Sequence, residues 1–167
     1  MQGKLDIRKV LIPVDFSDTS RKAFYVGVRF ARFFDAETHI LHINEPIASF
    51  DSSYEKVEAV SEELARLETG VKRRINELFD HGGIAEVDRR KVKVHIEGGK
   101  PHVRIVRFAI KEGIDMIVMG THGHAGIKTI LLGSTTERVV RTAPCSVLCI
   151  KPDGYISPLE DKEFKNV

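Results

Sequence analysis

The chain reads, from residue 10 onward, Val10-Leu11-Ile12-Pro13-Val14-Asp15-Phe16-Ser17. Its first five residues are apolar without a break, which is typical of a strand that is buried on both faces of a sheet. An aspartate then ends the apolar run, and Ser17 can cap a helix that follows it. We therefore predict a strand over residues 10–14 and a helix over residues 18–34.

Short apolar runs and helix-period segments continue to alternate along the chain. In the first helix, Ala23, Val26, Phe30 and Phe33 recur every three or four positions. A longer apolar stripe over residues 57–78 predicts a second helix that lies on the sheet. The alternative is that this stripe forms the seam of a coiled coil. Further strands are predicted over residues 40–43, 92–96, 115–119 and 146–150, and further helices over residues 101–112 and 134–142, the last capped by Ser134. This alternation predicts a doubly wound α/β fold: five parallel strands with helices on both faces, as in Rossmann-like nucleotide-binding sheets.

The composition favours one ordered domain. The chain has 167 residues, 42% of them hydrophobic and 30% charged, and a formal net charge of +2, which fits a single globular domain. No cluster of Lys and Arg forms a nucleic-acid-binding surface, and no run reaches the ~18 apolar residues of a membrane span or forms a signal peptide. We therefore expect a cytosolic protein with neither kind of partner. We assign residues 1–152 to the domain and the polar residues 153–167 to a C-terminal appendage.

Few side chains suggest redox, metal or nucleophilic chemistry. Cys145 and Cys149 lie about 13 Å apart along a predicted strand, so we expect two reduced core thiols. His39 and His42 differ by three positions and point to opposite faces of one strand. The two histidines in the segment 122–124 could bind a metal ion together, but they lack a nearby third ligand. The hydrolase motif Gly-x-Ser-x-Gly is absent, so we name no catalytic and no metal-binding residue.

Polar residues alternate with apolar ones in the strand predicted over residues 92–96. Lys91, Lys93 and His95 separate the apolar positions. Charged side chains of this kind protect the exposed edge of a sheet. We therefore predict that this strand lies at an edge.

A glycine-containing loop follows the strand at residues 115–119. Gly120, Gly123 and Gly133 allow close approach of the backbone to a ligand, and the helix that begins near Ser134 supplies unpaired N–H donors. These features suit a phosphate group, although glycines that only end a strand and shape a turn would look the same. Neither a Walker loop nor a dinucleotide fingerprint is present.

The spacing of these glycines resembles that of the universal stress protein family. Its ATP-binding members carry Gly-x-x-Gly, nine residues, and then Gly-Ser or Gly-Thr; here Gly120 and Gly123 precede nine residues and then Gly133-Ser134. Other family motifs are matched, in the same order, by residues 10–17, 41–43, 99–102 and 144–148. The resemblance covers about residues 8–151, and it implies the strand order 3-2-1-4-5.

That order implies a ligand site. Strands one and four become neighbours where the winding reverses, so their carboxyl ends frame the crevice in which such sheets bind ligands. Carried over by position, the resemblance implies that adenine and ribose are bordered by Pro13, Val14, Asp15 and Ile43. It implies that ribose and phosphates are surrounded by Gly120, His122, Gly123, Gly133, Ser134, Thr135 and Thr136. Asp15 can accept ribose or adenine hydrogen bonds or help to hold a cation such as Mg²⁺ or Mn²⁺ near the phosphates, or it can simply cap the turn before the first helix.

The function that the resemblance implies is that of an ATP-binding regulatory or protective protein of the stress response, with at most slow ATP hydrolysis. An ATP-consuming enzyme, a protein that binds adenosine monophosphate or a cyclic nucleotide, and a nucleotide-free dimeric interaction module remain as alternatives. The strand at residues 146–150 has no Lys, Glu or internal Pro to protect an edge. We therefore expect a homodimer through this strand unless the tail from Asp153 covers it, and a regulatory protein partner whose identity the sequence does not give.

Overall fold

Five parallel strands form one sheet in the part of the chain that the computed structural model describes, residues 6–44, 57–121 and 132–155. The strands are β1 (Lys9–Pro13), β2 (Glu37–Asn44), β3 (Val92–Gly98), β4 (Met116–Gly120) and β5 (Ser146–Ile150). Their order is β3-β2-β1-β4-β5, and every neighbouring pair is parallel. The predicted fold class and strand order are confirmed.

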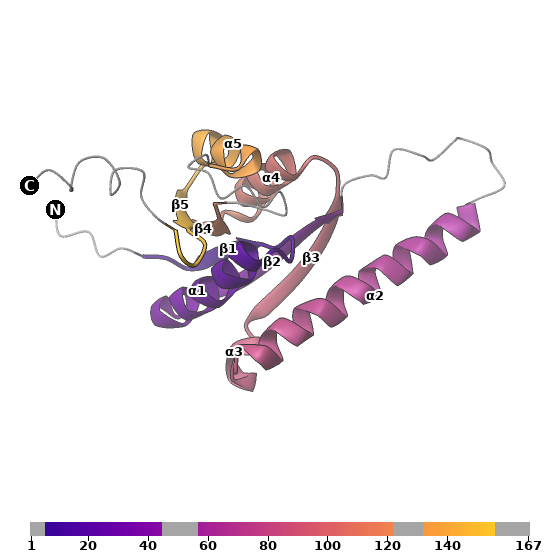
Figure 1. The fold of residues 1–167 in the computed structure, drawn as a ribbon, viewed down its shortest axis with the longest axis horizontal. Coiled ribbons are helices and arrows are strands. Elements are labelled where there is room, and N and C mark those ends of the chain that lie inside the picture. The colour runs from indigo at the N-terminus through magenta and orange to yellow at the C-terminus, as the bar shows by residue number, and fades with distance from the viewer. Residues whose placement is uncertain (1–5, 45–56, 122–131, 156–167) are drawn as a thin grey trace, which may run out of the picture.

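Helices cover both faces of the sheet (Figure 1). One face carries α1 (Asp18–Phe34) and α2 (Val57–His81), and the other carries α4 (Pro101–Glu112) and α5 (Ser134–Thr142). Val10 and Ile12 pack with α1 and α2, whereas Leu11 packs with α4 and α5. All three side chains are fully buried, as the continuous apolar run of β1 predicts. Among the described helices, none is long and apolar enough to cross a membrane.

Helix α1 has the predicted bounds but turns a different face to the sheet. Ser17 caps it, and its side chain accepts a hydrogen bond from the Ser20 N–H. The prediction that Phe33 belongs to the buried face is wrong, because its side chain is 83% exposed. The buried face includes Ala23, Phe24, Gly27, Val28 and Ala31. Its small residues let the helix lie close to β1, since a Cβ added at Gly27 would be 2.6 Å from Cδ1 of Ile12.

The two helices on the other face differ in how they begin. Helix α4 starts with Pro101 and ends at Gly113, which adopts a left-handed φ of 63°, as predicted. Helix α5 starts at Ser134, but the prediction that Ser134 caps it is wrong. The cap is Gly133, whose carbonyl accepts the Glu137 N–H at 2.9 Å, and no side chain of the described residues caps this helix.

The edges of the sheet are β3 and β5. The edge position predicted for residues 92–96 is confirmed, and Val94 remains exposed there. Cys145 and Cys149, beside and within β5, are both free, as predicted, but they are half-buried and are not, as expected, part of the fully buried core. Burial raises the pKa of each thiol, which keeps the thiolate form scarce near neutral pH.

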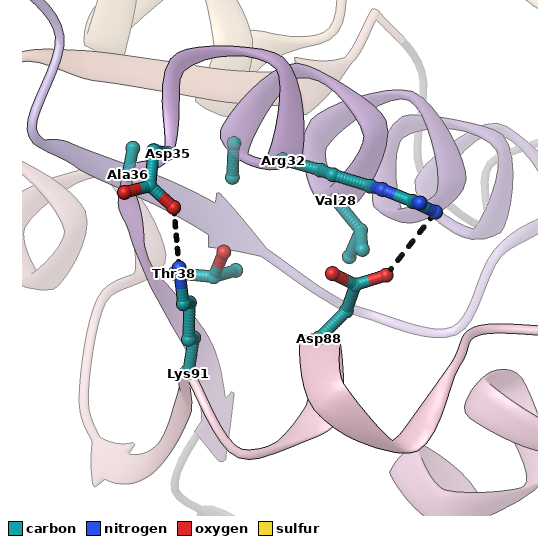
Figure 2. Close-up of a pocket in the computed structure, with 8 residues that line it drawn as sticks. Val28, Arg32, Asp35, Ala36, Thr38, Asp88 and Lys91 are labelled. Atoms are coloured by element: carbon teal, nitrogen blue, oxygen red, sulfur yellow. Dashed lines mark hydrogen bonds and ion pairs between the residues drawn. The ribbon is translucent and has the colours of Figure 1, made fainter.

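A short helix that the sequence analysis did not predict, α3 (Glu86–Arg89), precedes β3. Figure 2 shows how it joins the end of α1 around a hollow of about 30 Å³. Asp88 pairs with Arg32 of α1 at 3.4 Å, and Lys91 pairs with Asp35. These contacts attach α3 and the start of β3 to the turn between α1 and β2.

Candidate functional site

The start of α5 is held against the carboxyl end of β4. The Thr136 hydroxyl, on a residue only 4% exposed, donates to the Gly120 carbonyl at 2.8 Å. The Gly133 N–H donates to the Thr121 carbonyl at 2.7 Å. These two bonds fix the first turn of α5 beside the end of a central strand.

The first turn of α5 carries no side-chain cap among the described residues. A helix leaves its first N–H groups without acceptors inside the helix, and its amino end carries a partial positive charge. At this end Ser134 is exposed and Thr135 is half-buried. The nearby Glu137 carboxylate pairs with Arg141 at 3.2 Å. Backbone N–H groups at the amino end of a helix are the donors that bind phosphate groups in many proteins.

The start of α1 also approaches the end of β4. A Cβ added at Gly120 would lie 2.9 Å from Cγ2 of Thr19, 3.1 Å from its carbonyl carbon and 3.2 Å from the Ser20 nitrogen. Only a residue without a side chain fits this contact unless the helix moves. Gly120 therefore serves the packing of α1 on the sheet, a role that the sequence analysis did not assign to it.

The turn between β1 and α1 follows the carboxyl end of β1, the neighbour of β4 in the sheet. Pro13 and Val14 are buried, and the Val14 N–H donates to the Leu41 carbonyl at 2.9 Å. The His42 Nδ1 lies 2.7 Å from the Val14 carbonyl, so Nδ1 must be the donor because a carbonyl only accepts. The sequence alone does not indicate this contact, because only the register of β1 with β2 brings His42 to the turn.

Asp15 has the turn-capping role that the sequence left open. Its Oδ1 accepts from the Ser17 N–H at 2.9 Å and from the Ser17 hydroxyl at 2.6 Å, and its own N–H donates to the Ser20 hydroxyl at 3.1 Å. The residue is nevertheless exposed at the carboxyl end of β1. Asp15 thus holds the turn while presenting a carboxylate at the edge of the site.

The next residue, Phe16, is held in a left-handed conformation with φ of 66° and is buried. Its ring centroid lies 5.0 Å from that of His42, and the Arg74 guanidinium of α2 lies 3.9 Å above the ring. A non-glycine residue in this conformation is strained, and the surrounding contacts offset that strain. Packing against β2 and α2 therefore stabilises the turn that carries Asp15.

The other predicted site residues are placed as follows. Ile43 is half-buried at the carboxyl end of β2 and packs toward the α4 and α5 face. His122 and Gly123 lie outside the described residues. Among the described residues no group of three or more His, Cys, Asp and Glu side chains is arranged to hold a metal ion. The structure thus brings the carboxyl ends of β1 and β4 and the start of α5 together at the same end of the sheet.

These features define a doubly wound α/β protein whose candidate ligand site lies where the strand order reverses. The model of the universal stress protein family matches residues 6–151. The chain therefore belongs to the universal stress protein family.

Individual relatives agree with this assignment. The universal stress protein MJ0531 of Methanocaldococcus jannaschii is 34% identical over 148 residues, which cover 86% of this chain and 82% of that protein. A second protein of that organism, MJ0577, is 32% identical over 163 residues, with 86% and 94% covered. The solved structure of UspA from Lactobacillus plantarum superposes with a TM-score of 0.71 at 28% identity, covering 86% of this chain and 97% of that one.

Proposed function

We propose that this protein binds an adenine nucleotide, ATP, between the carboxyl ends of β1 and β4. The observation that carries the proposal is the uncapped first turn of α5, fixed against the end of β4 by Thr136 and Gly133. Helix ends of this kind bind phosphate groups through backbone N–H donors. The reversal of strand order at β1 and β4 is where α/β sheets bind their ligands.

In this proposal each wall of the site takes one part of the nucleotide. The phosphates lie at the start of α5, and adenine and ribose lie along the ends of β1 and β2. The phosphate side consists of Gly120, His122, Gly123, Gly133, Ser134, Thr135 and Thr136, and the adenine and ribose side of Pro13, Val14, Asp15 and Ile43. Asp15 can bind ribose directly or through a divalent cation that accompanies the phosphates.

The proposed role is regulatory, in the cytoplasm and in the response to stress. Phosphate-holding groups alone do not make a fast hydrolase, which also needs a positioned water and a group that stabilises the transition state. We therefore propose a nucleotide-responsive protein with at most slow turnover, acting on a protein partner. A cyclic nucleotide is the second candidate ligand, because a universal stress protein with the same fold, 22% identical and with a TM-score of 0.60, has been solved in complex with cAMP.

Two linked measurements test nucleotide binding. Mass spectrometry of material released from purified, undialysed protein is expected to show ATP, and titration is expected to show tighter binding of ATP than of cAMP. Asp15→Asn is expected to weaken ATP binding by about tenfold, or about 1.4 kcal/mol, with little change in stability. The asparagine keeps an oxygen that can accept the Ser17 hydrogen bonds, but it removes the charge.

Asp15→Ala is the matched comparison, because it removes both the charge and the acceptor. It is expected to weaken ATP binding at least as much and also to cost about 1 kcal/mol of stability through the lost cap. If both variants bind ATP like the parent protein while only the alanine variant melts earlier, Asp15 caps the turn and has no part in binding. Release of cAMP, or of no nucleotide together with no measurable ATP binding, would reject ATP as the ligand.

We also propose that two copies pair through β5. The Thr121 N–H donates to the Ile150 carbonyl, so Ile150 points its backbone groups toward β4. Because successive residues of a strand alternate in direction, the backbone groups of Val147 and Cys149 point to the free edge. Among the described residues no strand pairs with this edge, and residues 146–150 carry no charge. Such an edge favours pairing with a second strand, and a copy of the same edge can pair about a two-fold axis.

Val147→Pro is expected to convert a dimer into a monomer, because proline removes an N–H that points to the free edge. Light scattering at micromolar concentrations is expected to show a dimer for the parent protein and a monomer for the variant. Leu148→Pro is the control, since it removes an N–H on the β4 side and is expected to lower the melting temperature. A monomeric parent, or a Val147→Pro variant that remains dimeric, would contradict pairing through this edge.

A further inference from the structure

A hollow of about 330 Å³ lies between the first half of α1 and the second half of α2. It is lined by Phe16, Arg21, Tyr25, Arg74, Glu77, Leu78 and His81. Apart from Phe16, which follows Asp15, these residues belong to the two helices and not to the candidate nucleotide site. The volume lies at the lower end of the range for small-molecule sites, about 300–1,000 Å³.

The inner wall of the hollow is aromatic and apolar. Phe16 and Leu78 are buried, and Tyr25 is half-buried. The Tyr25 ring lies so close to the end of α2 that a Cβ added at Gly82 would clash with it. Tyr25 also meets Phe24 edge to face, at 5.4 Å between ring centroids. The Tyr25 ring is therefore held in place by packing on two sides, so it forms a firm wall.

The rim of the hollow carries cationic groups that the described carboxylates do not neutralise. The Arg74 guanidinium lies over the Phe16 ring and forms no ion pair with any described carboxylate. The Arg21 Nε donates to the Phe16 carbonyl at 3.2 Å, and its one acidic contact, at 3.8 Å, is with the almost fully exposed Asp18. Among the described residues, one carboxylate lines the hollow, that of Glu77, and it pairs with Arg73 at 2.5 Å.

We propose that this hollow binds a small organic anion that carries an aromatic ring. The ring packs against the half-buried Tyr25, and the anionic group meets Arg74 and Arg21. A guanidinium that stacks on an aromatic face leaves its N–H edge available for a phosphate or carboxylate. Charge complementarity therefore selects an anion, while the aromatic wall selects its ring.

Titration of the full chain with phenyl phosphate, followed by the backbone amide signals of an NMR spectrum, tests this site. Phenyl phosphate is expected to bind at least ten times more tightly than either inorganic phosphate or benzyl alcohol, each of which supplies one half of the ligand. The signals that shift are expected to be those of the residues around the hollow. Equal affinities for the three probes, or shifts confined to the carboxyl ends of β1 and β4, would overturn the proposal.

Variants of α2 separate a specific site from general attraction of anions. Arg74→Gln is expected to weaken phenyl phosphate binding at least tenfold. Lys72→Gln removes one positive charge two residues away, from a side chain that pairs with Glu68 and does not line the hollow, and is expected to leave the affinity unchanged. Glu77→Gln is expected to tighten binding about two- to fivefold, because it removes a carboxylate that lines the hollow. Equal losses in Arg74→Gln and Lys72→Gln would overturn the proposal.

A competition experiment with ATP keeps this proposal separate from nucleotide binding. Saturating ATP is expected not to displace phenyl phosphate, because the two ligands occupy different sites. Displacement would place the probe in the nucleotide site and overturn the inference. If ATP does not bind at all, the response of phenyl phosphate binding to Arg74→Gln still decides whether the hollow is a site.

Discussion

Replacing Gly120 by alanine is expected to destabilise the protein by about 1–3 kcal/mol, the usual cost of forcing an extra group into a packed interior. The added Cβ would meet the backbone of Thr19 and Ser20 at 3.1 and 3.2 Å, as well as the Thr19 methyl group at 2.9 Å. Backbone atoms cannot move aside as the end of a flexible side chain can. The start of α1 must therefore shift away from β4, and urea unfolding measures the loss.

Gly70→Ala is the matched control, since it adds the same single carbon. Gly70 lies inside α2, and nothing lies within 4 Å of an added Cβ. Alanine in a helix interior is favoured over glycine by about 0.5–1 kcal/mol, so this variant is expected to become more stable. A Gly120→Ala variant as stable as the parent protein would show that the contact with α1 relaxes without cost, and the glycine would then be explained by ligand binding alone.

Sequence patterns predicted the elements of the fold because each pattern reports a local preference. The continuous apolar run of residues 10–14 predicted β1, and Ser17, Pro101 and Gly113 predicted where two helices begin or end. The buried face of α1 was predicted incorrectly, because periodicity gives the spacing of apolar residues and not which neighbours approach. Because α1 packs closely on β1 at Gly27, the helix face that contains Gly27 is buried and Phe33 is left exposed.

The candidate site was predicted in part for the same reason. Motif positions identified the loop and strand ends that could border a ligand, but they assigned the cap of α5 to Ser134 instead of Gly133. The roles of His42 and Arg74 depend on contacts between residues far apart in the chain. Such contacts follow from strand register and helix placement, which a single sequence does not determine.

Two neighbouring histidines, the buried His39 and the half-buried His95, are expected to make the stability of this protein sensitive to acid. His39 of β2 is 1% exposed, and its Nδ1 lies 3.2 Å from Nε2 of His95 on β3. The His39 Nε2 lies 2.5 Å from a carboxylate oxygen of Glu37, which also pairs with Lys93 at 2.9 Å. Burial lowers the pKa of both imidazoles and outweighs the opposing effect of Glu37 on His39. The charged groups that act on the pair are Glu37, Lys93, Glu97 and Glu112.

The direction of the pH effect depends on whether the folded or the unfolded state binds protons more readily. An imidazole with a lowered pKa in the folded state binds its proton more readily after unfolding, so acid favours the unfolded chain. The stability that the pair contributes is complete above the ordinary histidine pKa of 6.5 and falls as the pH decreases toward the folded pKa. The loss amounts to at most about 1.4 kcal/mol per pH unit for each histidine.

Urea unfolding at pH 7.5 and pH 5.5 is therefore expected to show a loss of stability of up to about 3 kcal/mol for the two histidines together. Both values lie above the range in which Glu37 takes up a proton, since the pKa of that carboxyl is lowered, chiefly by its hydrogen bond with Lys93. His39→Gln is expected to lose stability at pH 7.5 through altered packing but to show a smaller difference between the two pH values. His102→Gln, at a histidine of α4 outside the pair, is expected to retain the full difference. Proton uptake by the histidine pair is reduced when His39 is replaced. If His39→Gln and the parent protein nevertheless lose equal stability between pH 7.5 and 5.5, the acid sensitivity comes from other groups.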